Sequence, residues 1–418
     1  MKILWFSPTP SLYQQGKHHY HGGGWIESLE KTMHNNPNIS LGVAFMHPTD
    51  HQKVNQNNVV YYPILRKRSR KNPVKALINN WRGKIDGDNI VDKFLEVIND
   101  FQPDIIQVFG TENAFALIQP HTKIPVLVHL QGLINPVVNA YFPPNYSKWN
   151  IIFSKHFIFE NIKGASPFFS QKRFKAQAKR EKQIFSQLKY VCGRTAWDKQ
   201  ITHLFNPNIQ YFHIDEVLRP EFYLPHHQNS TKKVFTILST LSPSTYKGID
   251  VVLKAAQQLT NLCNVQFEWK IVGMDASTKL LKLFENKENI SHKKVNITLL
   301  GKLNALQLIN EMKEADVFVH PSYIDNSPNS VCEAQLMGLP IIACHVGGVG
   351  SLIHHNEDGF LISSNGVYEL VHYLQQLYNN PNLRQQLGNK AQEIANERHQ
   401  PKKITENLLA AYLSILQK

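Results

Sequence analysis

The feature that most constrains the fold is the stretch 317–343. It consists of an apolar run, a polar turn rich in Ser, Asp, Asn and Pro, a helical pattern that ends at Gly338, and a second apolar run. Short apolar runs separated by a helix are typical of parallel strands that are buried on both faces. The stretch therefore predicts strand, loop, helix and strand. It places Asp325 and Glu333 at the carboxyl edge of a parallel sheet, where such folds bind ligands.

The same alternation of apolar runs and helical patterns fills the rest of the chain in two successive series. It predicts an α/β fold with two doubly wound, Rossmann-like domains. Strands are expected at 2–6, 41–45, 59–62, within 103–112, at 124–130 and at 190–192 in the first series, and at 234–238, 268–272, 296–300, 316–319, 341–343 and 359–362 in the second.

The boundary between the two series is expected within residues 213–232, which contain two prolines and a polar, turn-like segment. A chain of 418 residues is also too long for one core of ordinary size. We predict an N-terminal, acceptor-binding domain over residues 1–215, joined by a C-terminal helix at about 403–418. The C-terminal domain, residues 216–402, is predicted to bind a nucleotide sugar, for reasons given below.

The net charge of +13 lies mostly in the first half of the chain, with basic clusters at 66–71 and 172–182. Such clusters can meet nucleic acid, anionic lipid or anionic substrates, and a solvated basic face is the alternative. No nucleic-acid-binding signature accompanies them, so no nucleic acid partner is expected. We expect neither a transmembrane helix nor a signal peptide. The four scattered cysteines predict reduced thiols of a cytoplasmic protein and no metal site.

Residues 134–170 break the alternation because they are rich in aromatic side chains with lysines between them. This composition suits a membrane interface or a hydrophobic acceptor groove. A pair of helices packed into a core is the alternative interpretation. The aromatic residues are Tyr141, Phe142, Tyr146, Trp149, Phe153, Phe157, Phe159, Phe168 and Phe169.

Three charged residues of the second series carry the expected chemistry. Glu333 lies in the first turns of a predicted helix, where its carboxylate can accept two hydrogen bonds from a ribose diol. Asp325 lies eight residues earlier, and Lys247 offers a cation just before Gly248 and a helix start, where a diphosphate can sit. In the first series, glycines 22–24 stand between a strand and a helix and can let backbone N–H groups approach an anion, or they form a flexible loop tip.

With these residues the sequence resembles the retaining glycosyltransferases of family four, also described as glycosyl transferases group 1. The resemblance covers essentially the whole chain and is strongest at about 235–362. It implies the GT-B fold, in which two Rossmann-like domains face each other across a cleft. The motif that carries it is Asp325, Glu333-Ala334, Gly338-Leu339-Pro340 and Gly347-Gly348-Val349.

The resemblance implies that Glu333 binds the ribose of the nucleotide, that Asp325 binds hydroxyls of the donor sugar, and that Lys247 binds the diphosphate. These three are the expected catalytic residues, and no metal or other cofactor is expected. The expected donor-binding residues are Ser239, Thr240, Lys247, Gly273, Asp325, Asn326, Ser327, Pro328, Asn329, Ser330 and Glu333. On the acceptor or phosphate side they are Gly22, Gly23, Gly24, His129, Gln131 and Arg194.

The sequence departs from the family in three places. Asp325 stands where Glu is usual. The usual Arg shortly before Lys247 is missing, and Arg219 or Arg194 is a candidate replacement. The family often has a His at the end of an N-terminal-domain strand, where strand alternation leaves both His129 and Gln131 as candidates.

The function implied is transfer of a hexosyl-type sugar, with retention of configuration, from a nucleotide diphosphate sugar to a glycan or lipid-linked acceptor. Surface polysaccharide biosynthesis is the expected setting, in the cytoplasm and peripherally at an anionic inner membrane face. Another GT-B enzyme, such as a nucleotide-sugar epimerase or a phosphorylase, is one alternative. A non-catalytic sugar- or nucleic-acid-binding protein is the other.

Overall fold

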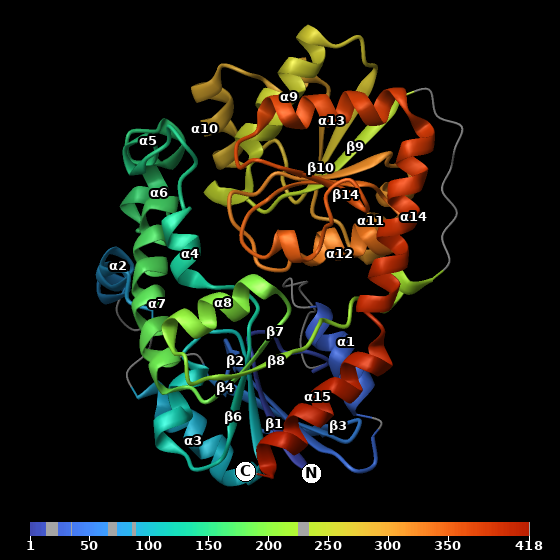
Figure 1. Ribbon diagram of the computed structural model, residues 1–418. Helices are drawn as coiled ribbons and strands as arrows, with labels where there is room; N and C mark the ends of the chain where they lie inside the picture. The colour runs from blue at the N-terminus through green and yellow to red at the C-terminus, as the bar shows by residue number, and fades with distance from the viewer. Residues whose placement is uncertain (14–23, 35, 66–72, 86–88, 225–233, 418) are drawn as a thin grey trace. The chain divides into compact units, whose positions relative to one another are not determined.

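The computed structural model describes residues 1–13, 24–34, 36–65, 73–85, 89–224 and 234–417 (Figure 1). The chain forms two compact units. The first comprises Met1–Val138, Lys172–Arg219 and His399–Lys418, and the second comprises Asn139–Gln171 and Pro220–Arg398. Each unit contains a largely parallel sheet between helices, which confirms the predicted α/β fold class.

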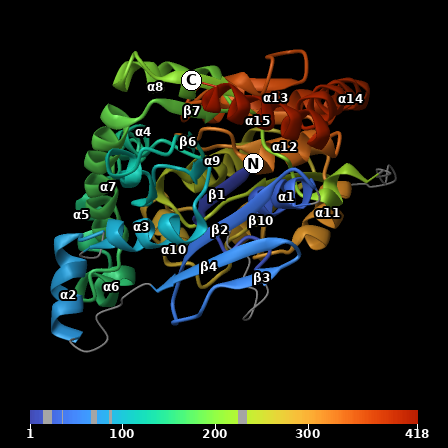
Figure 2. The same cartoon turned by 90° about the horizontal axis from the view of Figure 1, so that it is seen from below.

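The first unit is built on an eight-stranded sheet with the order β3-β4-β2-β1-β5-β6-β7-β8. All neighbouring strands are parallel except the β3–β4 pair, which closes one edge of the sheet (Figure 2). The strands are β1 (Lys2–Ser7), β2 (Ser40–His47), β3 (Val54–Gln56), β4 (Val59–Leu65), β5 (Ile105–Phe109), β6 (Val126–His129), β7 (Tyr190–Gly193) and β8 (Gln210–His213).

Helices cover both faces of this sheet because alternate residues of each strand point to opposite faces. In β1, Leu4 and Phe6 pack into one buried cluster, and Ile3 and Trp5 into another. The helices are α1 (Gly24–Met33), α2 (Pro73–Arg82), α3 (Ile90–Phe101), the 3₁₀ helix η1 (Phe115–His121), α4 (Ile134–Asn139), α7 (Pro167–Gln187), α8 (Ala196–Phe205) and α15 (Pro401–Leu416).

The C-terminal helix α15 is part of the first unit. Its buried face joins the cluster of Ile3 and Trp5, and the Tyr412 hydroxyl accepts a hydrogen bond from Trp5 Nε1 at 3.2 Å. Tyr412 in turn donates to the side chain of Gln107 in β5. A helix from the far end of the chain thus completes the core of the first sheet.

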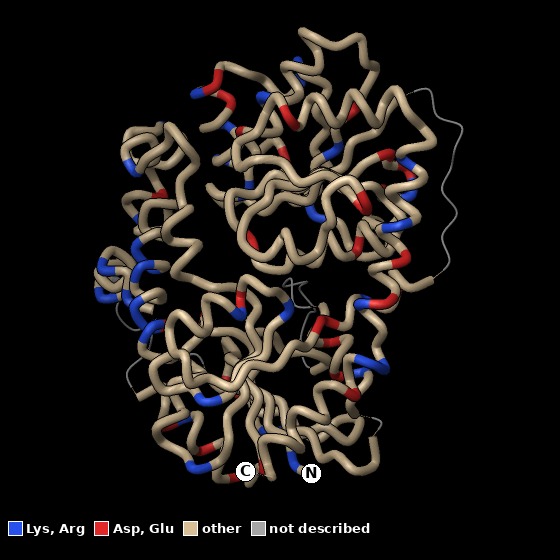
Figure 3. The backbone as a smooth tube through the Cα atoms, in the orientation of Figure 1, with Lys and Arg blue, Asp and Glu red and all other residues tan. Residues whose placement is uncertain are grey.

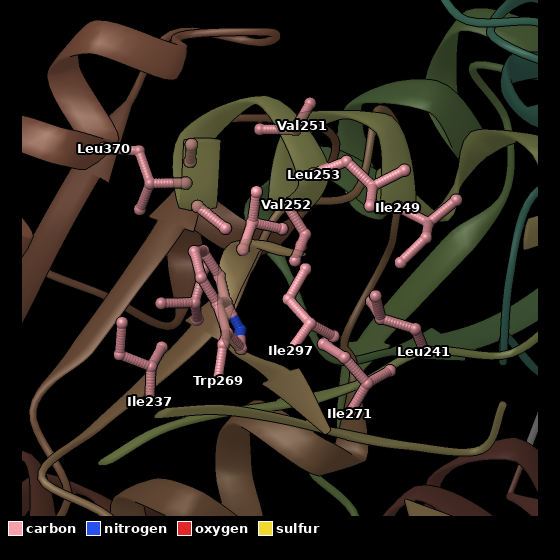
Figure 4. Close-up of a cluster of buried hydrophobic side chains, with 14 of the residues drawn as sticks. Ile237, Leu241, Ile249, Val251, Val252, Leu253, Trp269, Ile271, Ile297 and Leu370 are labelled. Carbon is pink, nitrogen blue, oxygen red and sulfur yellow. The ribbon is translucent and has the colours of Figure 1, made fainter. Parts of the chain in front are cut away.

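The second unit contains a six-stranded parallel sheet with the order β11-β10-β9-β12-β13-β14. Trp269 of β10 is fully buried on one face, among apolar side chains of α9 and of the neighbouring strands (Figure 4). The strands are β9 (Phe235–Thr240), β10 (Phe267–Val272), β11 (Ile297–Gly301), β12 (Val317–His320), β13 (Ile341–Cys344) and β14 (Gly359–Ile362).

Most helices of the second unit connect its strands, and α5, η2 and α6 belong to the segment Asn139–Gln171 that precedes the strands. None of the helices in the described ranges is long and apolar enough to cross a membrane. The helices are α5 (Lys148–Ile152), η2 (Lys155–Phe157), α6 (Ile158–Ile162), η3 (Pro220–Tyr223), η4 (Thr245–Lys247), α9 (Ile249–Leu262), α10 (Lys279–Glu288), η5 (His292–Val295), α11 (Ala305–Lys313), α12 (Asn329–Leu336), η6 (Val349–Ser351), α13 (Val367–Asn379) and α14 (Pro381–Arg398).

The division of the chain differs from the predicted one at residues 139–171, which pack with the second unit. Tyr146, Ile151 and Phe157 from this segment are buried in the core of the second unit. The Tyr146 ring lies 4.5 Å from that of Phe284, and its hydroxyl donates to Glu288 Oε1 at 2.5 Å. Burial of these apolar groups explains why residues 139–171 pack with the second unit, although β6 and β7 on either side belong to the first.

Close backbone packing joins three loops at the carboxyl edge of the second sheet. Gly248 adopts φ +77°, and a Cβ there would lie 2.1 Å from the carbonyl oxygen of Pro321. Gly347 adopts φ +53°, and a Cβ there would lie 1.9 Å from the carbonyl oxygen of Asp325. The N–H of Gly348 donates to the same carbonyl at 3.0 Å. The loops after β9, β12 and β13 are therefore held together through glycines.

Alanine substitutions can separate the two reasons for glycine at these positions. Gly301→Ala should cost about 1 kcal/mol, because Gly301 has φ +68° but open space around its missing Cβ. Gly248→Ala and Gly347→Ala should each cost about 2 to 4 kcal/mol, since the new methyl group also displaces backbone. Urea unfolding of the full chain measures the three free energies. Equal losses at all three positions would contradict the close packing.

Candidate functional site

An ion pair occupies the carboxyl edge of the second sheet. Lys247 ends η4 after β9, Asp325 lies in the loop after β12, and Lys247 Nζ lies 2.5 Å from Asp325 Oδ2. The two side chains are 20% and 19% exposed. Burial alone would lower the pKa of Lys247, but the Asp325 carboxylate outweighs it and raises that pKa. Burial likewise opposes ionisation of Asp325, yet Lys247 and His320 hold its pKa below the usual range. Both groups are therefore charged at neutral pH.

His320 is a third member of this cluster that the sequence analysis did not assign. It is the last residue of β12 and is only 2% exposed. Its Nε2 atom lies 3.1 Å from Asp325 Oδ2, the same oxygen that contacts Lys247. The signal in the sequence is a polar residue that closes an apolar run at a sheet edge where ligands bind. The imidazole therefore contacts the Asp325 carboxylate from the end of β12.

Glu333 lies in the fifth position of α12 and is 4% exposed. The helix begins after Pro328, whose side chain makes no cap hydrogen bond, and the Val331 N–H donates to the Pro328 carbonyl at 2.9 Å. Asn326 and Ser327, in the loop before it, are also buried. The structure thus brings the predicted loop, helix start and carboxylate to one edge of one sheet.

The predicted donor residues on β9 and β10 have different environments. The Ser239 hydroxyl is fully buried, donates to the Val319 carbonyl at 2.8 Å and accepts from Trp269 Nε1 at 3.1 Å. The hydroxyl therefore stabilises the sheet, and a direct donor contact of Ser239 stays a prediction. Thr240 Oγ1 is buried without a hydrogen-bond partner in the described ranges. Gly273 follows β10 with φ +96° and packs closely on the carbonyl of Leu241.

His129 lies in the interior of the first unit, and its role on the acceptor side stays a prediction. Its ring is fully buried and lies 5.0 Å from that of Trp25 in a T-shaped contact. Burial, with a contribution from the Arg194 charge, lowers the pKa of His129 to about 3. The imidazole is therefore neutral and packed. Gln131 lies two residues beyond the end of β6 and is half-buried.

Arg194 is also engaged within the first unit. Its Nη1 atom lies 3.3 Å from the buried carboxylate of Glu216, and its guanidinium lies 4.7 Å from the Trp25 ring centre. The Glu216 carboxylate therefore neutralises the charge of Arg194. This pairing disfavours Arg194 as the replacement for the arginine that the family usually has before Lys247. Gly24 begins α1 and packs on Arg219, whose Cδ would be 3.0 Å from a Cβ at Gly24. Gly22, Gly23 and the basic cluster 66–71 lie outside the described residues.

Glu112 is a further carboxylate that sequence analysis did not assign. It follows β5 at the carboxyl edge of the first sheet, and its side chain packs over Gly110 and Gly132. Burial and the nearby charge of Glu181 raise its pKa to about 7. Arg180 and Gln177 of α7 hold this loop by donating to the Glu112 carbonyl. A carboxyl group with such a pKa exchanges protons near neutral pH.

Three comparisons with known proteins bear on this geometry. The family model for glycosyl transferases group 1 matches residues 223–394, within the second unit. An uncharacterised glycosyltransferase of Haemophilus influenzae is 30% identical over 189 residues, which are 44% of this chain and 51% of that protein. The UDP-Gal:alpha-D-GlcNAc-diphosphoundecaprenol alpha-1,3-galactosyltransferase of Escherichia coli is 37% identical over 81 residues, 19% of this chain and 20% of that enzyme. The chain thus spans about half the length of the first relative and a fifth of the second.

A solved structure matches over nearly the entire length. Anabaena HepE in complex with UDP-glucose superposes with a TM-score of 0.65, covering 99% of this chain and 100% of that one, at 15% identity. That level of identity speaks for the fold alone, which is the GT-B fold of two Rossmann-like units. The family match falls on the unit that contains Lys247, Asp325 and Glu333. Residues 223–394 thus match the glycosyl transferases group 1 family, and the chain has the GT-B fold.

Proposed function

We propose that the protein is a retaining glycosyltransferase of family four that uses a nucleotide diphosphate sugar as donor. The acceptor is a glycan or a lipid-linked sugar, and the product enters a surface polysaccharide. HepE, a protein of the same fold, binds UDP-glucose, and the Escherichia coli relative acts on a diphosphoundecaprenol-linked sugar. These names support the donor and acceptor classes.

The observation that carries the proposal is the joint placement of Lys247, Asp325 and Glu333 at one sheet edge. Lys247 supplies a cation for the diphosphate, and the N–H groups that begin α12 add positive potential for phosphate oxygens. Glu333 accepts hydrogen bonds from the ribose. Asp325 accepts them from donor-sugar hydroxyls once Lys247 turns to the phosphate.

The chemistry follows from the leaving group. The bond between the sugar anomeric carbon and the diphosphate oxygen breaks, and its electron pair stays on the diphosphate. An acceptor hydroxyl forms the new bond from the same face, and its proton passes to the departing phosphate oxygen. Lys247 stabilises the charge that develops on the diphosphate. This route needs neither an enzymic nucleophile nor a metal or other cofactor.

On the acceptor side, the carboxyl edge of the first sheet offers Gln131 and Glu112 as hydrogen-bonding groups. A lipid-linked acceptor places the enzyme in the cytoplasm, peripherally at the inner membrane face. The basic surplus of the first half of the chain suits an anionic surface. No nucleic acid partner is proposed.

A panel of UDP-, GDP- and ADP-sugars tests the proposal directly. Release of free nucleoside diphosphate, increased by an acceptor, supports transfer. Conversion of a nucleotide sugar into its epimer without release of diphosphate would point to an epimerase. Absence of both turnover and nucleotide binding would leave a non-catalytic protein.

Glu333→Ala should weaken binding of the nucleoside diphosphate about 10- to 100-fold, because two charge-assisted hydrogen bonds to the ribose are lost. Isothermal titration calorimetry measures the affinity. Glu357→Ala is the matched control, since Glu357 is an exposed carboxylate of the same unit. Lys247→Ala should lower kcat more than it lowers nucleotide affinity. Unchanged affinity in Glu333→Ala would remove the ribose role.

Asp325→Asn should have opposite effects on binding and on transfer. It frees the Lys247 ammonium, so a nucleoside diphosphate should bind about three- to tenfold more tightly, since it no longer competes with a carboxylate. The matching nucleoside monophosphate, which lacks the second phosphate, should bind as before. Transfer should fall because the donor sugar loses an acceptor of hydrogen bonds. If Asp325→Asn changes the affinities for the two nucleotides equally, Lys247 does not bind the second phosphate.

A further inference from the structure

Residues 148–163 of the second unit present an unusual concentration of exposed apolar side chains. The inner side of this segment is buried through Ile151 and Phe157. Elsewhere in the same segment, Phe153 is 80% exposed and Phe159 is 71% exposed. Large exposed apolar groups that gather within a short segment indicate an interaction surface. The exposed apolar residues are Trp149 (53%), Phe153 (80%), Ile158 (52%), Phe159 (71%) and Ile162 (58%), and we call them the aromatic face.

The helices that carry the aromatic face are fixed to each other and to the second unit. The Asn161 side-chain amide donates to the carbonyls of Ile151 and Ile152, at 3.3 and 3.2 Å, and so ties α6 to the end of α5. The rings of Trp149 and Phe153 stack with centres 5.8 Å apart and planes 15° apart. The exposed rings are thus carried by two helices that are fixed to each other, α5 and α6, which lie next to each other in Figure 1.

The segment that carries the aromatic face is mainly basic. Lys148, Lys155 and Lys163 are exposed among its members. Glu160 is the sole carboxylate between residues 139 and 171, and it is paired with Lys279. Lys148 Nζ also lies 4.9 Å from the Trp149 ring centre. Figure 3 marks the positions of Lys, Arg, Asp and Glu along the backbone. The face therefore combines apolar rings with three positive charges and a neutralised carboxylate.

We propose that the aromatic face docks on the surface of an anionic phospholipid bilayer. Trp and Phe side chains enter the boundary between headgroups and acyl chains, while lysines contact lipid phosphates. Charge complementarity selects this occupant, because a bilayer surface can be uniformly negative over the whole patch. The inference deepens the proposed function, since a lipid-linked acceptor would be reached from this surface, but lipid binding itself requires no sugar transfer.

Vesicle sedimentation with the full-length protein tests the inference. We expect binding to vesicles of phosphatidylcholine with 30% phosphatidylglycerol (roughly the charge of an anionic leaflet) and much weaker binding to phosphatidylcholine alone. Phe153→Ser with Phe159→Ser should reduce binding at least tenfold. The triple variant Lys148→Gln, Lys155→Gln and Lys163→Gln should lose the preference for anionic vesicles while retaining its fold by circular dichroism.

A double variant elsewhere in the second unit is the matched control. Leu306 and Tyr368 are 63% and 71% exposed and lie outside the aromatic face, so Leu306→Ser with Tyr368→Ser should bind vesicles like the wild type. Undiminished binding of the Phe153/Phe159 variant would overturn the inference, because the basic clusters elsewhere would then suffice. Vesicle binding that is absent in the wild type, together with self-association that the same variant abolishes, would assign the face to a second copy of the chain and also overturn it.

Nucleotide binding, measured on the same samples, keeps the two proposals apart. Wild-type protein that binds a nucleoside diphosphate but no vesicles overturns the lipid inference alone. Wild-type protein that binds anionic vesicles through the aromatic face but neither binds nor turns over any nucleotide sugar supports the lipid inference and overturns the proposed function.

Discussion

The ion pair between Lys247 and Asp325 is the interaction on which the candidate site depends. A carboxylate or an ammonium that is largely removed from water raises the free energy unless an opposite charge meets it. Each residue meets this need of the other, and His320 contacts the same carboxylate oxygen. The close approach of Gly248 to Pro321 and of Gly347 to Asp325 holds the backbone of the same loops. Pairing and packing therefore support each other.

This pair also restricts the ligands that can replace it. A ligand that separates the two residues has to offer an anion to Lys247 and hydrogen-bond donors to Asp325. Inorganic phosphate brings the anion alone, and a free sugar brings hydroxyls alone. A nucleotide diphosphate sugar carries both in one molecule, so under the proposed function the pair favours the intact donor over its fragments. His320, behind the carboxylate, fixes a side chain that is one methylene shorter than the usual glutamate.

The sequence predicts the parallel strands because each is a short apolar run between polar turns. It does not predict β3 or β8, which are three- and four-residue strands at sheet edges with partly exposed side chains and no apolar run. Within the site, Lys247, Asp325 and Glu333 follow from their places after strands and in a helix start. The burial of Ser239 and His129 does not follow from the sequence, since their surroundings depend on Trp269 and Trp25 from other elements.

For residues 139–171, amino-acid composition alone does not predict which side chains are buried and which are exposed. Their aromatic and basic content is visible in the sequence, and the interpretation as helices packed into a core describes part of the segment. Tyr146, Ile151 and Phe157 are buried and give the segment its place in the second unit. The stacked rings of Trp149 and Phe153 add nothing to that core, because both are more than half exposed. Exposure of these rings to water is unfavourable, and folding of the chain does not bury them. Contact with the surface of a binding partner would bury them.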